Sequence, residues 1–146
     1  MKFYARAIAV LSSLGTLNAL YLTTLFLRNR WQAPAPSVCD FSETVSCTKV
    51  ITSPSALFLG VPVCSIALLV YPALIIIAVA ALRRGKTRDL FYLSSLVSAM
   101  GLMLNVVYVD NEFAQLRAAC VLCIVCTVLI ALDLAASVQG YRLSAK

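Results

Sequence analysis

The chain has 146 residues, of which 62% are hydrophobic and only 12% are charged. A water-soluble domain of this length needs a largely polar surface, so this composition excludes an ordinary soluble protein. The formal net charge is +6. The basic residues are scattered over short loops, which argues against a nucleic-acid-binding protein.

Four apolar stretches divide the chain, and each has about 20 residues or more, enough for a helix that crosses a bilayer core of roughly 30 Å. They cover residues 7–27, 57–82, 90–109 and 118–138. Backbone groups in lipid must satisfy their hydrogen bonds within the segment, which favours a helix for each stretch. We therefore predict an all-α integral membrane protein, a four-transmembrane-helix bundle that forms a single domain over residues 1–146.

The first stretch has the alternative of a cleaved signal peptide, because Lys2 and Arg6 precede it and Ala-Pro-Ala follows at 33–35. The apolar core of a signal peptide spans about 7–15 residues, and this stretch is longer. It is also flanked by Arg28 and Arg30. We expect it to be kept as the first membrane helix.

The distribution of lysine and arginine predicts the orientation, because these residues are enriched in cytoplasmic loops. With the N-terminus inside, eight basic residues lie inside and four lie outside. The inside set is Lys2, Arg6, Arg83, Arg84, Lys86, Arg88, Arg142 and Lys146, and the outside set is Arg28, Arg30, Lys49 and Arg117. Both termini are therefore expected in the cytoplasm, with an extracytoplasmic loop over residues 28–56 between the first two helices.

This topology gathers all six cysteines in the outer half of the protein. The loop carries Cys39 and Cys47, and the helices carry Cys64, Cys120, Cys123 and Cys126. The bacterial exterior is oxidising, and an even number of cysteines there indicates disulfides. Cα atoms three residues apart in a helix are about 5 Å apart, so Cys120 and Cys123 can bond to each other. Cys39 and Cys47 can bond to each other, or the loop can bring one of them to the helix.

The start of the fourth helix decides the surroundings of Cys120. If the helix begins near Arg117, Cys120 lies in the first turn, where the positive helix end favours a thiolate. If instead Asp-Asn-Glu at 110–112 caps an earlier start, Cys120 lies too deep for the helix dipole to help much. Arg117 assists in either case.

An ordered set of motifs runs through most of the chain. It consists of Cys39-Asp40, Ser46-Cys47, Ser53, Gly60-Val61-Pro62 and Cys120-Val121-Leu122-Cys123, with Gly-Thr-Leu-Asn-Ala-Leu-Tyr at 15–21. This set resembles the vitamin K epoxide reductase family. The resemblance implies an electron relay from a thioredoxin-like partner, through two cysteine pairs, to a quinone in the membrane.

The resemblance also implies a role for each site residue. Cys39 exchanges with the partner, and Cys47 attacks the sulfur of Cys120. Cys123 faces the quinone, and Ser53 supports the active site by hydrogen bonding. This placement fits the chemistry, because one sulfur must meet water-borne thiols and another a lipid-borne oxidant.

The implied electron acceptor is a quinone of the ubiquinone or menaquinone (vitamin K) type, with no metal. Candidate quinone contacts besides Cys123 are Tyr21, Phe58, Asn105 and Tyr108. We expect no fused thioredoxin-like domain, and the expected partner is a separate thioredoxin-fold disulfide oxidase on the outer face. We expect a bacterial inner membrane protein whose redox cysteines face the periplasm or exterior.

The chain departs from the family pattern at two places. Animal members carry Thr-Tyr-Ala just past the CxxC, where this chain has Cys126-Thr127-Val128, and many members carry Asn at the position of Val63. These departures favour quinone reduction coupled to protein disulfide formation over epoxide reduction. Vitamin K-type quinones or epoxides are further candidate substrates.

The sequence is also compatible with other classes of function. Paired thiolates could serve a soft-metal transport or binding protein, although the oxidising compartment and the lack of histidine oppose this. The four relay cysteines could form two structural disulfides, or the bundle could stabilise another complex. Cys64 and Cys126 are most simply small apolar residues. Asp133, inside the fourth helix, is expected to pair with Arg142 or the basic loop at 83–88.

Overall fold

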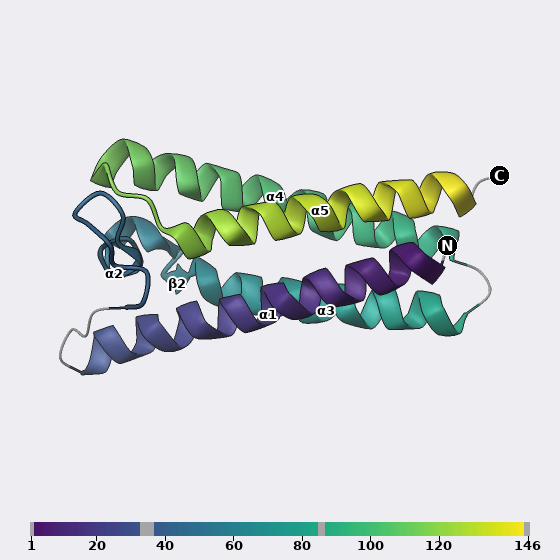
Figure 1. Cartoon of the computed structure of the whole chain (residues 1–146), viewed down its shortest axis with the longest axis horizontal. Helices are drawn as coiled ribbons and strands as arrows, with labels where there is room; N and C mark the ends of the chain where they lie inside the picture. The colour runs from purple at the N-terminus through teal and green to yellow at the C-terminus, as the bar shows by residue number, and fades with distance from the viewer. Residues whose placement is uncertain (1, 33–36, 85–86, 145–146) are drawn as a thin grey trace.

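The structure is a computed structural model that describes residues 2–32, 37–84 and 87–144. Its four long helices lie side by side (Figure 1): α1 (Lys2–Trp31), α3 (Val63–Arg83), α4 (Arg88–Leu116) and α5 (Val121–Ser144). All four are long and apolar enough to cross a membrane. The predicted all-α bundle with four membrane-spanning helices is confirmed.

The chain crosses the bundle four times, and successive long helices run in opposite directions. α1 packs on α3 and α5, and α4 packs on α5 and α3. α1 begins and α5 ends at one end of the bundle, while the connection between α1 and α3 lies at the opposite end (Figure 1). We call that opposite end the loop end.

The distribution of side chains is inverted relative to a soluble bundle. Large apolar side chains point outward, among them Leu17, Leu69, Ile76 and Met103. The interior combines a few large apolar side chains, such as Phe91 and Leu74, with small residues and hydroxyl groups that let the helices approach closely. Gly15 and Gly140 are the closest contacts, because an added Cβ would collide with the rings of Tyr71 and Phe91.

The buried polar groups bond between helices inside the bundle. Ser12 Oγ donates to Asp133 Oδ2 at 2.9 Å, and Ser94 and Ser137 share a hydrogen bond of 2.8 Å. Asp133 is fully buried. Among the described residues, its hydrogen-bond partner is Ser12 of α1, in place of the basic group expected from the sequence.

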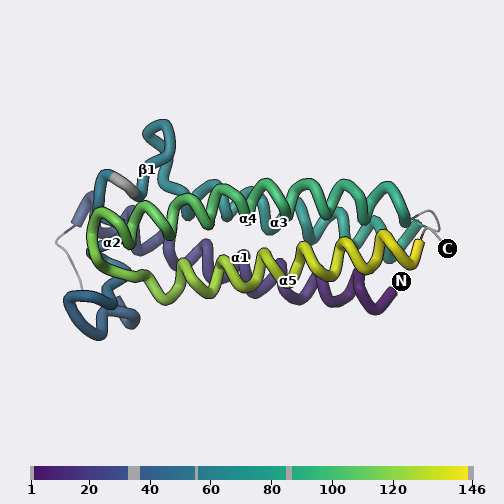
Figure 2. The backbone as a smooth tube through the Cα atoms, turned by 90° about the horizontal axis from the view of Figure 1, so that it is seen from above, coloured from purple at the N-terminus to yellow at the C-terminus, as the bar shows by residue number. Residues whose placement is uncertain are grey.

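The second membrane helix begins later than the sequence suggested. Residues 57–62, expected within this helix, form a small hairpin in which β1 (Leu57–Phe58) pairs with β2 (Val61–Pro62). The turn needs positive φ at Leu59 (51°) and Gly60 (85°), and glycine adopts this conformation without steric cost. Pro62 then stands immediately before α3 (Val63–Arg83), where its missing N–H removes no helical hydrogen bond. The hairpin projects from the side of the bundle (Figure 2).

The helix boundaries around residue 117 separate the two alternatives for Cys120. Residues 110–112 continue α4, which ends at Leu116 with Arg117 in the left-handed conformation. α5 begins at Val121, so Cys120 immediately precedes the helix. The alternative in which residues 110–112 cap the fourth helix is therefore wrong.

Candidate active site

The loop cysteines are joined to each other. A disulfide links Cys39 and Cys47, whose Cα atoms are 5.7 Å apart. Cys47 is the first residue of the short helix α2 (Cys47–Ile51). Cys39 is only 4% exposed, and Cys47 is fully buried in a cluster with side chains of α1 and the start of α5. The pair is therefore packed against the bundle, and an incoming protein thiol needs the loop to move.

The carboxylate of Asp40 organises the loop around this disulfide. It accepts hydrogen bonds from the Ser37 amide (2.6 Å), the Ser46 hydroxyl (2.7 Å), and the amide (3.0 Å) and hydroxyl (2.6 Å) of Thr48. Burial raises the pKa of Asp40, but these hydrogen bonds outweigh it and hold the pKa well below its usual value. Asp40 thus ties the segment before Cys39 to α2 beyond Cys47.

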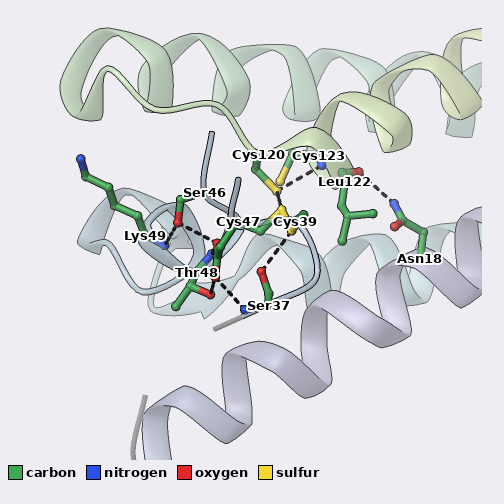
Figure 3. The surroundings of a disulfide bond; sticks show 11 residues. Asn18, Ser37, Cys39, Ser46, Cys47, Thr48, Lys49, Cys120, Leu122 and Cys123 are labelled. Atoms are coloured by element: carbon green, nitrogen blue, oxygen red, sulfur yellow. Dashed lines mark hydrogen bonds between the residues drawn. A yellow bond between two sulfur atoms is a disulfide. The ribbon is translucent and has the colours of Figure 1, made fainter. Parts of the chain in front are cut away.

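From the sequence, Asp40 was recognised only as part of the Cys39-Asp40 motif, and no role in organising the loop was predicted for it. The signal was the run of short polar residues around the two cysteines, since such side chains cap turns and helices locally. Ser46 does so directly, because its hydroxyl caps α2 by accepting from the Lys49 amide at 3.2 Å (Figure 3).

The start of α5 brings Cys120 against the loop pair. Cys120 Sγ lies 3.1 Å from Cys47 Sγ (Figure 3). A backbone hydrogen bond of 2.9 Å from the Ala119 amide to the Thr44 carbonyl holds the two segments together, in a bridge between Val45 and Ala119. The contact is therefore anchored by the backbone next to each cysteine.

Cys120 occupies the position that caps α5. Its Sγ accepts a hydrogen bond from the Cys123 amide at 3.3 Å, in the way that a serine or aspartate caps a helix. Negative charge that develops on this sulfur faces the positive end of the helix. Arg117, expected to assist Cys120, ends α4 with an exposed side chain.

Residues that follow Cys120 along α5 accept hydrogen bonds from polar side chains of three other helices. Asn18 Nδ2 on α1 donates to the Leu122 carbonyl at 2.9 Å and to Cys126 Sγ at 3.0 Å. Tyr71 on α3 donates its hydroxyl to the Cys126 carbonyl at 2.9 Å. Asn105 on α4 donates to Thr127 Oγ1 at 2.9 Å.

An apolar cleft opens between α3, α4 and α5 beside these groups. Its lining residues are Val63, Ile66, Ala67, Val70, Tyr71, Gly101, Leu104, Asn105, Cys126 and Ile130. The lining is almost entirely apolar, and Asn105, Tyr71 and Cys126 are the lining residues with polar side-chain atoms.

The predicted quinone contacts separate into two groups. Asn105 lines the cleft, and its partner Thr127 donates to the Cys123 carbonyl at 3.0 Å. Tyr21, Phe58 and Tyr108 are not among the lining residues of this cleft. Phe58 instead belongs to the hairpin at the loop end, and Tyr21 is exposed on α1.

Ser53 lies near the loop pair and shapes the chain that follows α2. It is buried, and its hydroxyl donates to the Val50 carbonyl at 2.7 Å. It also precedes the 3₁₀ helix η1 (Pro54–Ala56), which leads into the hairpin. These contacts fit a positioning residue.

Two cysteine pairs in contact at one end of a membrane-spanning bundle are the architecture of a membrane thiol–disulfide oxidoreductase. The model of the vitamin K epoxide reductase family matches residues 6–138, so the chain belongs to this family. Membership implies membrane disulfide oxidoreductase and quinone reductase activity. Comparison with curated proteins gives no match.

Proposed function

We propose that the protein passes electrons from a thioredoxin-like partner through Cys39 and Cys47, then through Cys120 and Cys123, to a membrane quinone. In this way it supports the formation of disulfides in other proteins. The observation that carries the proposal is the 3.1 Å separation between Cys120 Sγ and Cys47 Sγ, because thiol–disulfide exchange needs the attacking sulfur beside the disulfide.

The internal transfer runs through three sulfurs. The Cys47 thiolate attacks Cys120 of a Cys120–Cys123 disulfide, and Cys123 leaves as a thiolate. Cys39 then attacks Cys47, which breaks the Cys47–Cys120 bond and releases Cys120. The products are a Cys39–Cys47 disulfide and a Cys120/Cys123 dithiol, and the structure has this bonding pattern.

The surroundings of Cys120 favour its release in the second step. Cys120 Sγ becomes negative when it leaves Cys47, and both the Cys123 amide and the N-terminus of α5 stabilise that charge. Because Ala119 is hydrogen-bonded to Thr44, the two sulfurs stay aligned while bonds are exchanged.

Cys120 and Cys123 are reoxidised by a quinone, which is a substrate of the reaction. A bound quinone accepts two electrons and two protons, and the Cys120/Cys123 dithiol supplies both as it becomes a disulfide. The apolar lining of the cleft suits a quinone ring, and the Asn105 carboxamide is a polar group that can orient it. Tyr21, Phe58 and Tyr108 are proposed to contact the quinone outside this cleft.

The partner is proposed to dock over Cys39. Val38 and Phe41 are 78% and 74% exposed on either side of the loop cysteine. Such apolar side chains suit an interface with a thioredoxin-like protein, whose docking would also move the loop and uncover Cys39. In this proposal the loop end faces the periplasm or exterior of a bacterial inner membrane, and both termini face the cytoplasm.

The proposal is tested by quinone reduction with purified protein in lipid. Reduced thioredoxin-like protein is the electron donor, ubiquinone-1 and menadione are tried as acceptors, and quinone absorbance is followed. We expect catalytic loss of the quinone absorbance, and none with Cys123→Ala. Absence of turnover with both quinones and several thioredoxin-like donors would overturn the proposal.

A further inference from the structure

Cys126 has surroundings that an apolar packing residue does not need. Its side chain is 5% exposed, and its Sγ accepts a hydrogen bond of 3.0 Å from Asn18 Nδ2. A neutral amide donor aimed at sulfur stabilises negative charge there, as hydrogen bonds to a thiolate do. The Asn18 amide also bonds the Leu122 carbonyl, so its direction toward Cys126 is fixed.

The spacing of the cysteines is repeated from Cys120, just before α5, into the helix. Cys126 follows Cys123 by three residues, just as Cys123 follows Cys120. Residues three apart in a helix have Cα atoms about 5 Å apart, inside the disulfide range of about 4.4–6.8 Å. Cys123 can therefore bond to a cysteine on either side, toward the loop or toward the cleft.

The two neighbours of Cys123 face different reaction partners. Cys120 lies 3.1 Å from Cys47, the sulfur of the loop pair. Cys126 lines the apolar cleft together with Asn105 and Tyr71, whereas Cys123 is not among the lining residues. The cysteine that an acceptor in this cleft meets is thus Cys126.

We propose that Cys126 is a third redox cysteine, which forms a disulfide with Cys123 on the cleft side while Cys120 is engaged with the loop pair. This inference rests on the proposed function. The thiols of Cys123 and Cys126 give two electrons and two protons to a quinone, and a Cys123–Cys126 disulfide and a quinol result. The Cys120 thiolate then attacks Cys123 Sγ, and Cys126 leaves as a thiolate that takes up the proton lost by Cys120.

The added step separates quinone reduction at Cys123 and Cys126 from disulfide exchange between Cys120 and the loop pair. The second reaction is an exchange of disulfides with no net oxidation, so it needs no further reductant. Asn18 stabilises Cys126 as the leaving group in that exchange, because its amide already contacts the sulfur. Quinone reduction can then proceed while Cys120 is bonded to Cys47.

The test removes the loop pair and Cys120 as disulfide partners of Cys123, and it tests Cys64 and Cys126 separately. The parent variant carries Cys39→Ala, Cys47→Ala and Cys120→Ser, and two derivatives of it add either Cys126→Ser or Cys64→Ala. Each protein is reduced, freed of reductant and mixed with excess ubiquinone-1 without oxygen. Thiols are then counted by alkylation and intact mass, and quinone consumption is read by absorbance. Serine at position 126 keeps a hydrogen-bond acceptor for Asn18, so the Cys126→Ser derivative is matched in packing.

We expect the parent and the Cys64→Ala derivative to lose two thiols and to consume one quinone per protein. The Cys126→Ser derivative should lose none. The inference is overturned if the parent keeps all its thiols while the wild-type protein turns over the same quinone, or if the Cys126→Ser derivative still loses two. A wild-type protein that also fails to reduce quinone overturns the proposed function and this inference with it. Size-exclusion elution matching that of the wild type shows that each variant is folded.

Discussion

Cys120 Sγ lies 3.1 Å from Cys47 Sγ while Cys47 is bonded to Cys39, so three sulfurs from two distant segments meet at the loop end. The bridge between Val45 and Ala119 keeps this meeting in place from the backbone. The loop thus presents its disulfide to α5 in a defined register. The Cys39–Cys47 disulfide already lies beside Cys120, so no large loop movement is needed to bring them together.

The loop cysteines are predicted to matter most for a protein reductant. Cys39→Ala and Cys47→Ala should abolish quinone reduction driven by a thioredoxin-like protein, because a bulky partner cannot reach the buried Cys120. Both should keep a measurable part of the activity with dithiothreitol, since loss of the disulfide loosens the loop for a small reagent. Steady-state rates with the two reductants check this. An equal loss with both reductants would mean that the pair only holds the site together.

Asp40→Asn should loosen the loop. The carboxylate accepts from two amides and two hydroxyls, whereas a carboxamide has one acceptor oxygen and brings unwanted donors. Losing bonds to a charged acceptor should cost about 1.5–3 kcal/mol each where buried and less at this partly exposed position. Faster hydrogen exchange over residues 37–51 would reveal the effect.

Glu43→Gln is the matched control for Asp40→Asn. Glu43 is an exposed acidic residue of the same loop, and its side chain takes no part in the Asp40 network. Its exchange pattern should equal that of the wild type. The role assigned to Asp40 is contradicted if both variants behave alike.

The same carboxylate predicts an acid limit for the loop. The pKa of Asp40 is lowered in the folded protein, so the folded loop binds fewer protons than the unfolded loop. The stabilisation is complete above the ordinary aspartate pKa of about 3.9 and is lost as the pH falls further below it. Hydrogen exchange over residues 37–51, corrected for its intrinsic pH dependence, should therefore accelerate below about pH 4. Asp40→Asn should lack this acceleration, and its presence there would assign the transition to another group.

The four long helices could be predicted because an apolar stretch in lipid must satisfy its own backbone hydrogen bonds, and few structures other than a helix do so. The hairpin at 57–62 could not be predicted from periodicity, since Leu57, Phe58 and Leu59 continue the hydrophobicity of the helix that follows. Gly60 and Pro62 were the local signals of a turn. Leu59 is 91% exposed at its tip, which the apolar pattern alone does not suggest.

The site was predictable in its residues and less so in its contacts. Motif spacing singled out the four cysteines of the proposed relay, but spacing cannot assign disulfide connectivity, and it left open whether Cys39 bonds to Cys47. The partners of Asp133 and Cys126 are equally non-local. Ser12 and Asn18 on α1 reach them across more than a hundred residues of sequence, and such pairings follow only from the packing of α1 on α5.

The most direct test of the relay is the disulfide pattern of Cys123→Ser. Without Cys123, the Cys120 thiolate can still attack Cys47 of the Cys39–Cys47 disulfide and release Cys39 as a thiolate, and the resulting Cys47–Cys120 bond has lost its resolving thiol on the helix side. After cycling with the reduced partner and quinone, rapid acid quenching and peptide mapping without reductant should recover Cys47 linked to Cys120. The matched Cys64→Ser variant should show no such accumulation. Recovery of only the Cys39–Cys47 disulfide from Cys123→Ser, with Cys120 free, would contradict transfer through Cys47 and Cys120.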